Sequence, residues 1–473
     1  MRKSIFSLLG VLLLASACYK QNPEDERTVR YYANTFAYNV MNTYYLWKDD
    51  ITDALSHWTT TEDPIKKVEA ARYEMDRWTA LYDKFSDVED YFSGNLETFG
   101  LSFTLYYYDE AMTQVCAVVT YTYENSPARK AGLQRGDIIV TVDGELITPD
   151  NYPAQASKLW GTGSISLGLE DGRTVSLQSV QMYENPVHTA TTFDYGGKRF
   201  GYLHFTAFTL DSCPDLETVF GQFKAEGITD LILDLRYNGG GYVTTSTALA
   251  SMIAPPDVVK AKKVYNKEIY NDLLTQSDED NTCFAPEMTY KNTSGKEVTV
   301  HPLEVNPGIE HLWVIVTEDS ASASEAIICG LKPYMPVTLV GQKTDGKFTG
   351  GVLLSATYWF DSLKESSIDK EEGKAAIPGW GIYVIVSRYA DCNGETLSMP
   401  DGITPDYAAK DRPKETFPLG DPSEKMLAAT LSVATGGPAP ASVKSVSAQE
   451  ALPSARRPGF GVLLHQAVDV IAH

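Results

Sequence analysis

The sequence predicts a multidomain protein that combines α+β and α/β parts: an N-terminal helical segment, a β-rich module and a mixed αβ domain. Apolar residues recur at helical spacing between 24 and 94, and short strand-like runs fill 99–183. A strand, helix, strand pattern covers 312–340, as in parallel sheets. The length of 473 residues, 43% of them hydrophobic, fits two to four domains with their own cores.

Composition narrows the expected partners. The net charge is −22 with a pI near 4.7, and no basic patch interrupts it, so nucleic acid is not an expected partner. The cysteines after Cys18 are scattered and odd in number, so no disulfide framework or metal site is expected. No motif calls for a cofactor.

The N-terminus has the features of a targeting segment. Arg2 and Lys3 precede the apolar run Ile5–Leu14, and small residues then lead to Cys18. This resembles a bacterial lipoprotein signal, although Leu14 lies one place further from the cysteine than usual. We expect 1–18 to be removed or processed and Cys18 to be lipidated, with plain signal-peptidase cleavage as the alternative. An exported protein anchored by lipid, facing the periplasm or on the outer-membrane surface, would follow.

The segment 19–95 is predicted to form two or three amphipathic helices. It is dense in aromatic residues, which we interpret as core between packed helices, with a ligand groove as the alternative. These residues are Tyr44, Tyr45, Trp47, Trp58, Trp78 and Tyr82.

The strand, helix, strand unit carries the main chemical signal. After the apolar run Leu312–Val316, serines fill the start of a helix that Pro333 and Pro336 end before Val337–Val340. A helix N-terminus beyond a parallel strand favours developing negative charge. A serine there becomes a nucleophile if a desolvated lysine removes its proton. From the residues alone, the candidates are Ser320, Ser322 and Ser324 with Lys343 or Lys347.

A second turn could stabilise an oxyanion. The buried run Ile232–Leu235 leads into Asn238 and three glycines, Gly239–Gly241, and a helix begins near Thr244. Consecutive glycines let backbone approach a ligand closely. No G-x-G-x-x-G or G-K-[ST] pattern supports a nucleotide site. His204 alternates with its neighbours as a strand residue and lacks an acidic partner in sequence, so we do not assign it as a base.

The β-rich module has its own motif. In Asn125–Gly144, Pro127–Ala131 is predicted to form a short helix that Gly132 ends, and a strand follows Gly136 and Asp137. The motif is similar to the PDZ domains of bacterial proteases, so 96–185 is expected to be a PDZ-like domain. Such domains take up a peptide C-terminus as an added strand. By resemblance, the carboxylate loop comprises Phe99, Gly100, Leu101, Ser102 and Phe103, although the module could merely brace its neighbour.

These motifs together resemble the C-terminal processing peptidases, or tail-specific proteases, in their bacterial lipoprotein form. The resemblance rests on SASASE, the following GK turn, DLR-N-x-GG and the closing GI-x-PD within Asp401–Tyr407. It implies a serine endopeptidase with Ser322 as nucleophile and Lys347, twenty-five residues on, as base. Gly240, with Gly241 possible, and Ala323 would form the oxyanion hole. The expected substrates are polypeptides, cleaved near their C-termini, in a catalytic domain over 186–435.

Two positions depart from the family pattern. Many members carry a lysine-orienting glutamine four residues after the lysine, where this chain has Gly351. An acidic residue that is sometimes found eleven residues after the serine is here Pro333. A non-catalytic PDZ peptide-binding lipoprotein on a protease-like scaffold is therefore the alternative, and hydrolysis of another amide or ester is a third possibility. The polar stretch Val264–Gly308 is expected to be an inserted loop or hairpin, and 436–473 a flexible tail.

Overall fold

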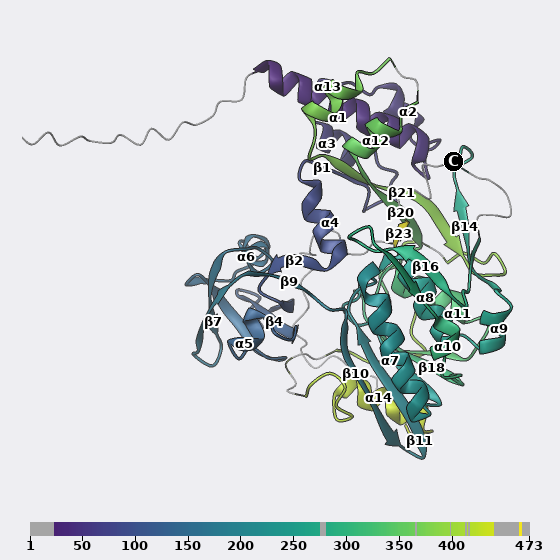
Figure 1. Ribbon diagram of the computed structural model, residues 1–473. Helices are drawn as coiled ribbons and strands as arrows, with labels where there is room; N and C mark the ends of the chain where they lie inside the picture. The colour runs from purple at the N-terminus through teal and green to yellow at the C-terminus, as the bar shows by residue number, and fades with distance from the viewer. Residues whose placement is uncertain are drawn as a thin grey trace, which may run out of the picture.

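The computed structural model describes residues 23–274, 281–364, 367–397, 399–411, 414, 417–438 and the backbone of 463–465 (Figure 1). The predicted signal peptide with Cys18, and all of the predicted tail except 436–438 and 463–465, lie outside the described residues. Within the part of the chain that the structure describes, no helix has both the length and the apolar character needed to cross a membrane.

The N-terminal segment is helical, as predicted, and it packs on a sheet built from distant parts of the chain. It contains α1 (Pro23–Tyr44), α2 (Thr52–Ser56), α3 (Pro64–Ala71) and α4 (Phe85–Ser93), with a short strand β1 (Ala80–Tyr82). The Asp63 carboxylate caps α3 by accepting two backbone N–H groups, and Gly94 ends α4 with φ +73°. Phe36, Val40 and Met41 share one core with Val384 and Ile385.

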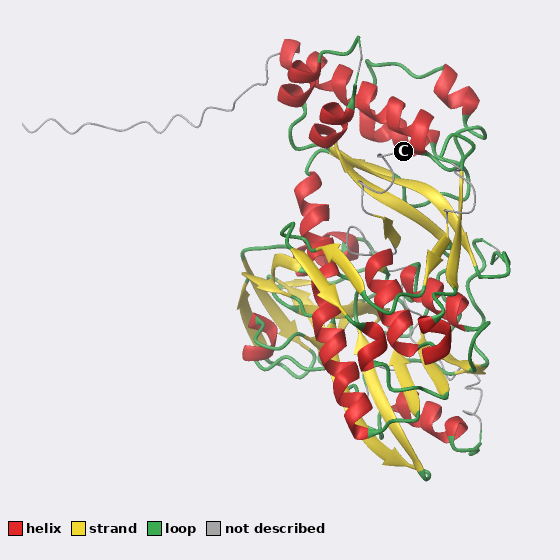
Figure 2. Cartoon of the chain, turned by 45° about the vertical axis from the view of Figure 1, so that its right-hand side comes forward, coloured by secondary structure: helices red, strands yellow, loops and turns green. Residues whose placement is uncertain are grey.

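That sheet lies under the N-terminal helices (Figure 2). Its strand order is β13, β23, β20, β21, β14, β15, and β1 also pairs with β21. The strands are β13 (Gly241–Tyr242), β14 (Val264–Tyr270), β15 (Asn281–Cys283), β20 (Thr349–Ser355), β21 (Gly381–Ala390) and β23 (Leu463–His465). Helices α12 (Ala356–Ser362) and α13 (Lys370–Ala376) contribute to the same core.

The PDZ-like module forms a separate small sheet with its own core (Figure 1). The order is β3 (Leu101–Tyr107), β4 (Val115–Thr122), β5 (Ile138–Val142), β7 (Ser164–Leu169), β8 (Thr174–Gln178), with β6 (Glu145–Leu146) on β5. Two short helices, α5 (Pro127–Lys130) and α6 (Tyr152–Leu159), cover it, and β2 (Asn95–Thr98) pairs with β9 (Val180–Tyr183) where the chain enters and leaves. Because β3 is the first strand in this order, it presents an edge.

The large sheet of the predicted catalytic domain carries the predicted strand, helix, strand units. Its order is β10 (Val187–Tyr195), β11 (Lys198–Phe205), β12 (Asp230–Asp234), β18 (His311–Val316), β19 (Val337–Gly341), β22 (Tyr407–Ala408). All pairs except β10 with β11 are parallel. Parallel pairing brings the carboxyl ends of β12 and β18 together, so the turns that follow them meet at one edge.

Both faces of this sheet are covered, which explains its continuous apolar strands. Leu231, Leu233 and Val314 point to the face packed by α7 (Cys213–Glu226), α8 (Val243–Ile253) and α11 (Ala323–Leu331). Ile232 and Ile315 point to the other face, against α14 (Lys425–Ala434). The remaining short elements are η1 (Leu210–Ser212), α9 (Pro256–Lys260), α10 (Pro302–Val305), β16 (Met288–Lys291) and β17 (Glu297–Val300). β16 and β17 form a hairpin within the predicted polar insert. The prediction is wrong for the start of that stretch, where β14 pairs with β21 as part of the sheet under the N-terminal helices.

Candidate active site

Ser322 occupies the position between β18 and α11 where the sequence predicts a nucleophile. It is the N-cap of α11, with φ +58° and ψ −110°, a conformation that L-residues rarely adopt. The side chain is fully buried, and its hydroxyl has no hydrogen-bond partner among the described residues. A buried, unpartnered hydroxyl on a strained backbone is typical of functional sites.

The neighbouring serines are engaged in structural bonds. The Ser320 hydroxyl donates to the Leu235 carbonyl at 2.9 Å and accepts from the Thr317 N–H. The Ser324 hydroxyl donates to the Asn238 carbonyl at 2.9 Å. Among the three candidate serines, the structure therefore leaves only the Ser322 hydroxyl uncommitted within its described residues.

The Glu325 carboxylate holds the serine turn against the lysine turn. One of its oxygens accepts the backbone N–H groups of Ser322 at 2.9 Å and Lys347 at 3.0 Å. Its other oxygen accepts from the Thr344 hydroxyl at 2.5 Å and the Gly346 N–H at 2.8 Å. Burial raises the pKa of Glu325 to about 7, while these donors oppose the shift. One carboxylate thus fixes residues on both sides of the site.

The Tyr389 hydroxyl ties the same two residues together from strand β21. It donates toward the carbonyl oxygens of Ser322, at 3.0 Å, and Lys347, at 3.1 Å. Together with Glu325, it brings Ser322 and Lys347 side by side although they are far apart in the chain. The backbones of the predicted nucleophile and the predicted base therefore lie side by side, while no hydrogen bond joins the Ser322 hydroxyl to the Lys347 amine in the described structure.

Lys347 is enclosed by groups from three parts of the fold. Its side chain is fully buried, and its Nζ donates to the Tyr383 hydroxyl at 2.9 Å. The Nζ lies 5.2 Å from the centre of the Trp78 ring and 5.1 Å from that of Tyr383. Burial lowers the pKa of Lys347 to about 7, although Asp76, Asp345 and Glu325 favour its charged form. At neutral pH a large fraction of this amine is therefore uncharged.

The other candidate lysine lies in solvent. Lys343 has 53% of its side chain exposed and pairs with Asp401, itself exposed, at 3.4 Å. An exposed lysine paired with a carboxylate lacks the desolvated setting that a lysine base needs. The structure thus distinguishes Lys347 from Lys343, which the spacing of residues alone left open.

The glycine turn lies beside the serine turn, as predicted. The Asn238 carbonyl accepts from the Ala321 N–H at 3.1 Å and from the Ser324 hydroxyl. It therefore binds one residue that precedes Ser322 and one that follows it. The Gly240 N–H, predicted to bind an oxyanion, donates instead to the Asn238 side-chain oxygen at 2.9 Å. Gly241 has φ +141°, and a Cβ there would lie 2.3 Å from the Phe208 carbonyl oxygen. Only glycine fits at that position.

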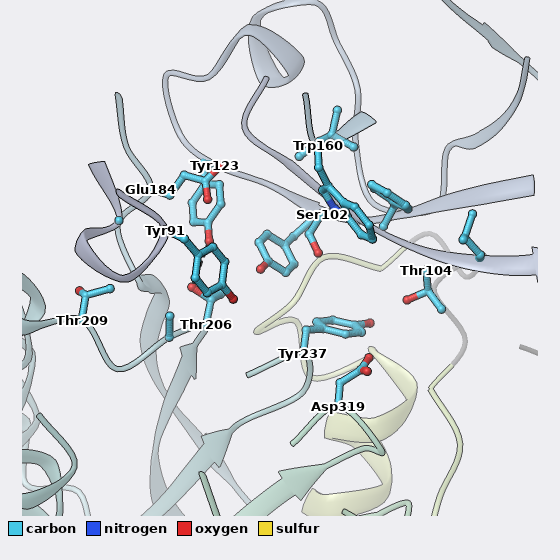
Figure 3. Close-up of a pocket in the computed structure, with 16 residues that line it drawn as sticks. Tyr91, Ser102, Thr104, Tyr123, Trp160, Glu184, Thr206, Thr209, Tyr237 and Asp319 are labelled. Carbon is cyan, nitrogen blue, oxygen red and sulfur yellow. Dashed lines mark hydrogen bonds between the residues drawn. The ribbon is translucent and has the colours of Figure 1, made fainter. Parts of the chain in front are cut away.

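A cavity of about 120 Å³ lies between the PDZ-like domain and the catalytic part (Figure 3). Ser102 and Trp160 point into it from the PDZ-like domain, and Tyr237 and Asp319 lie opposite (Figure 3). Trp160 stacks on Phe103, with ring centres 4.9 Å apart. Three of the predicted carboxylate-loop residues, Leu101, Ser102 and Phe103, line this cavity. Phe99 and Gly100 precede β3, and the Gly100 N–H donates to Thr98.

A smaller hollow continues from this cavity toward the glycine turn. Tyr91, Ala207 and Thr209 line both spaces, and the second also touches Gly239–Gly241. Asp319, on the floor of the first, lies three residues before Ser322. The edge strand of the PDZ-like domain is therefore connected to the predicted oxyanion turn by a continuous set of lining residues.

A buried ionic network docks the PDZ-like domain onto this region. Arg135 donates to the Tyr237 hydroxyl at 2.9 Å and to Asp411 at 2.7 Å. Arg236, fully buried, pairs with Asp234, Asp411 and Glu424 at 2.6 to 3.1 Å. Burial alone would raise the pKa of Asp411, but Arg135 and Arg236 lower it. Tyr237, which takes part in this docking contact, directly precedes Asn238 in the chain.

His204 is a buried strand residue, as predicted. It lies in β11, and neither ring nitrogen has a hydrogen-bond partner among the described residues. Burial, and then the nearby His188, Arg236 and Arg135, lower its pKa well below the usual value. Within the described ranges, no group of three or more His, Cys, Asp or Glu side chains gathers as metal ligands would.

Sequence reasoning missed the residues that surround the lysine. Trp78 was interpreted as core of a helical segment, yet its ring covers the Lys347 amine. Glu325 stands in the SASASE run, which could have drawn attention to it. Tyr383 and Tyr389 lie in an apolar strand far from both catalytic candidates in sequence, and no local pattern marks them.

Comparison with known proteins agrees with this geometry. Residues 199–409 match peptidase family S41, and 118–157 match the PDZ domain. A carboxyl-terminal-processing protease of Synechocystis sp. is 25% identical over 325 residues, which cover 66% of this chain and 63% of that protein. The chloroplastic carboxyl-terminal-processing peptidase 3 of Arabidopsis thaliana is 29% identical over 245 residues, covering 49% and 42%. The chain thus spans less than two thirds of the length of these relatives.

A solved structure shows the same fold. A crystal structure of a Bacteroides fragilis protein assigned to the S41 proteases superposes with a TM-score of 0.64. It is 22% identical, and the match covers 85% of this chain and 97% of that one. The sequence matches themselves identify a peptidase family S41 domain over residues 199–409, with a PDZ domain, residues 118–157, ahead of it.

Proposed function

We propose that this protein is a serine endopeptidase in which Ser322 and Lys347 form a catalytic dyad. One observation carries the proposal: Glu325 and Tyr389 join the backbone of a fully buried lysine, whose pKa is about 7, to that of a buried serine whose hydroxyl has no partner among the described residues. A lysine that is uncharged at neutral pH can act as a general base. The names of the curated relatives, which describe carboxyl-terminal processing, support the same reaction class.

In the proposed reaction, Ser322 Oγ attacks the scissile carbonyl while the neutral Lys347 amine takes its proton. The ammonium then gives that proton to the leaving amine, and an acyl-enzyme ester remains on Ser322. Lys347, neutral again, takes a proton from water, and the hydroxide attacks the ester. The ammonium returns that proton to Ser322 Oγ as the new carboxyl end leaves. Since the base must be uncharged, kcat/KM should rise with pH through about 7.

The oxyanion would be held by backbone N–H groups at the start of α11 and in the glycine turn. Ala323 is the first residue of α11, where N–H groups lack intrahelical partners. Gly240 joins when its N–H turns from Asn238 toward the substrate oxygen, and Gly241 in the same turn is the alternative donor. Each such donor contributes about 3 kcal/mol of transition-state stabilisation in other acyl-transfer enzymes.

The substrate in this proposal is a polypeptide bound as added strands. The exposed edge of β3 and the cavity beside it suit an extended peptide whose C-terminal carboxylate meets the loop Phe99–Phe103. Near the dyad, β13 and β20 both pair with β23, so an extended segment fits between the glycine turn and the strand that follows Lys347. Here the chain's own residues 463–465 occupy that slot.

Export and lipid anchoring at Cys18 belong to the same proposal. They rest on the order of residues within 1–18, where basic residues come first, an apolar run follows, and small residues lead to Cys18. Metabolic labelling with a radioactive fatty acid should mark the wild type and not Cys18→Ser. Equal labelling of both would overturn the anchor.

The function is tested by cleavage of a denatured, fluorescently labelled protein. Ser322→Ala and Lys347→Met should each abolish cleavage. Ser367→Ala and Lys343→Met are matched controls, because both side chains are exposed, and they should retain wild-type rates. If the wild type binds C-terminal peptides but cleaves nothing between pH 6 and 9, the protein is a non-catalytic peptide-binding protein. Hydrolysis of esters without peptides would change the substrate class.

A further inference from the structure

We propose that Tyr383 is the positioning residue of Lys347, and that Gly351 is small because its side-chain space holds the Tyr383 phenol. The inference rests on the proposed function of Ser322 and Lys347 and names the group that orients the base. Tyr383 is 2% exposed, and its hydroxyl accepts the hydrogen bond from Lys347 Nζ at 2.9 Å.

The two strands interlock at this point. Gly351 lies in β20 and Tyr383 in β21, which pair in antiparallel fashion. A Cβ added at position 351 would lie 2.4 Å from both the ring carbon that carries the hydroxyl and the hydroxyl oxygen itself. That separation is too short for any side chain there to coexist with Tyr383 in its present position. The phenol therefore replaces whatever group a longer residue at 351 would offer to Lys347.

A phenol hydroxyl can serve the amine in both of its protonation states. It accepts a hydrogen bond from the ammonium and can donate one to the lone pair of the neutral amine. Burial raises the pKa of Tyr383 well above its usual value, so the hydroxyl keeps its proton. Lys347 thus keeps one fixed partner while its proton comes and goes.

The other groups that face Lys347 do not orient its amine by a hydrogen bond that the structure describes. Trp78 meets the Nζ with its ring at 5.2 Å, which attracts the charged form without fixing a direction. Asp76, Asp345 and Glu325 act on Lys347 through their charges. Asp76 accepts from Tyr45, Trp78 and Thr79, and Glu325 binds the Lys347 backbone N–H rather than its side chain.

The first test removes only the hydroxyl. In Tyr383→Phe, kcat/KM at its alkaline plateau should fall about 10- to 100-fold, as for the loss of a hydrogen bond to a charged group. Because the hydroxyl stabilises the ammonium, the acidic limb of the pH profile should move to lower pH by about one unit. Tyr290→Phe is the matched control, since it removes another buried hydroxyl, bonded to the Leu210 carbonyl at 2.9 Å. It should leave the profile unchanged.

A readout independent of cleavage separates this inference from the proposed function. Titration of 13C-labelled lysine by NMR should place the Lys347 resonance, assigned by its loss in Lys347→Met, at lower pKa in Tyr383→Phe than in the wild type. If nothing cleaves peptides but this shift occurs, the proposed function fails and the pairing stands. Superimposable titrations and pH profiles of wild type and Tyr383→Phe would overturn the inference.

The second test exchanges the two positions. Gly351→Gln alone should inactivate the enzyme, because the new side chain collides with the phenol, and Tyr383→Ala alone should lose the bond to Lys347. In the double variant the amide oxygen can accept from Lys347 Nζ in the space that the phenol vacates. Its kcat/KM should exceed the product of the two single effects by at least about tenfold. Simple additivity would contradict the exchange of roles.

Discussion

At the scale of single residues, the backbone of Ser322 stores strain that its neighbours offset. A non-glycine residue in such a conformation costs about 1 to 3 kcal/mol. Glu325 accepts its N–H, while Tyr389 and the N–H groups of Glu325 and Ala326 donate to its carbonyl. These bonds hold the backbone turn that carries the Ser322 hydroxyl in place.

Lys347 should cost the folded protein stability. Its pKa is about 7 in the folded state against an ordinary 10.5, so the unfolded chain binds more protons between these values. The free energy of unfolding should therefore fall as the pH drops from about 10 to 7. Lys347→Met, which keeps the length and apolar stem, should therefore raise the free energy of unfolding by a few kcal/mol at pH 7 while abolishing cleavage.

Urea unfolding of both proteins at several pH values measures this. The stability gain of Lys347→Met should shrink toward pH 10, where the unfolded lysine also begins to lose its proton. Lys343→Met, at an exposed site, should show no such trend. A destabilised Lys347→Met, or a gain that does not change with pH, would contradict a buried neutral amine.

At the scale of elements, the glycine turn depends on one close approach. Gly241→Ala would place a methyl group 2.3 Å from the Phe208 carbonyl oxygen at φ +141°. The turn should shift away from Ser322, and kcat/KM should fall by about 100-fold or more, as when an oxyanion donor is lost. The kcat/KM for peptide hydrolysis, measured at the alkaline plateau of the pH profile, gives the size of this loss.

Gly197→Ala separates the effect of strain from that of the site. Gly197 also has positive φ, +81°, but an added Cβ meets no atom within 4 Å. Its variant should lose some stability and keep its specific activity. Equal activity of Gly241→Ala and wild type would remove the turn from the mechanism.

The interface between the PDZ domain and the peptidase domain depends on Arg135. Removing its charge leaves the buried Asp411 and the half-buried Tyr237 with one partner fewer, so Arg135→Met should cost about 3 kcal/mol at the interface. The PDZ domain should then move as a separate body, which small-angle scattering would detect as a larger radius of gyration. Arg129→Met on the exposed PDZ surface should scatter like wild type. Unchanged scattering of Arg135→Met would show that other contacts hold the domain.

At the scale of the whole molecule, the strand β23 fills the slot that we assign to substrate. It pairs with Gly241–Tyr242 on one side and with Gly351–Val352 on the other. A chain ending at Pro438 should therefore show several-fold higher kcat/KM on an added peptide. A synthetic peptide of residues 458–470 should inhibit that shortened chain in trans. Equal activity of both chains, with no inhibition by the peptide, would show that the segment does not compete with substrate.

Local patterns in the sequence predict much of this molecule. The runs Leu312–Val316 and Val337–Val340 became β18 and β19, and the serines lie at the start of α11. Resemblance then selected Ser322 and Lys347, and both side chains are buried in the structure. These predictions succeed because periodicity and turn chemistry are encoded within a few adjacent residues.

The surroundings of the lysine could not be predicted in the same way. Trp78, Tyr383 and Tyr389 reach Lys347 from segments that meet only when β1, β20 and β21 pair. In the sequence, Gly351 stands where an orienting side chain is expected. Only the structure explains its small size, because the Tyr383 phenol occupies the space beside it. Likewise, no local pattern around Arg135 in the sequence predicts that it joins one domain to another through Asp411.

The most direct test of the dyad is the pH dependence of labelling by a serine-reactive fluorophosphonate, with the modified residue located by mass spectrometry. We expect one adduct, on Ser322, formed at a rate that rises through a single ionisation near pH 7 and that is lost in Lys347→Met. Labelling of a different serine, or a rate that stays constant from pH 5 to 10, would contradict it.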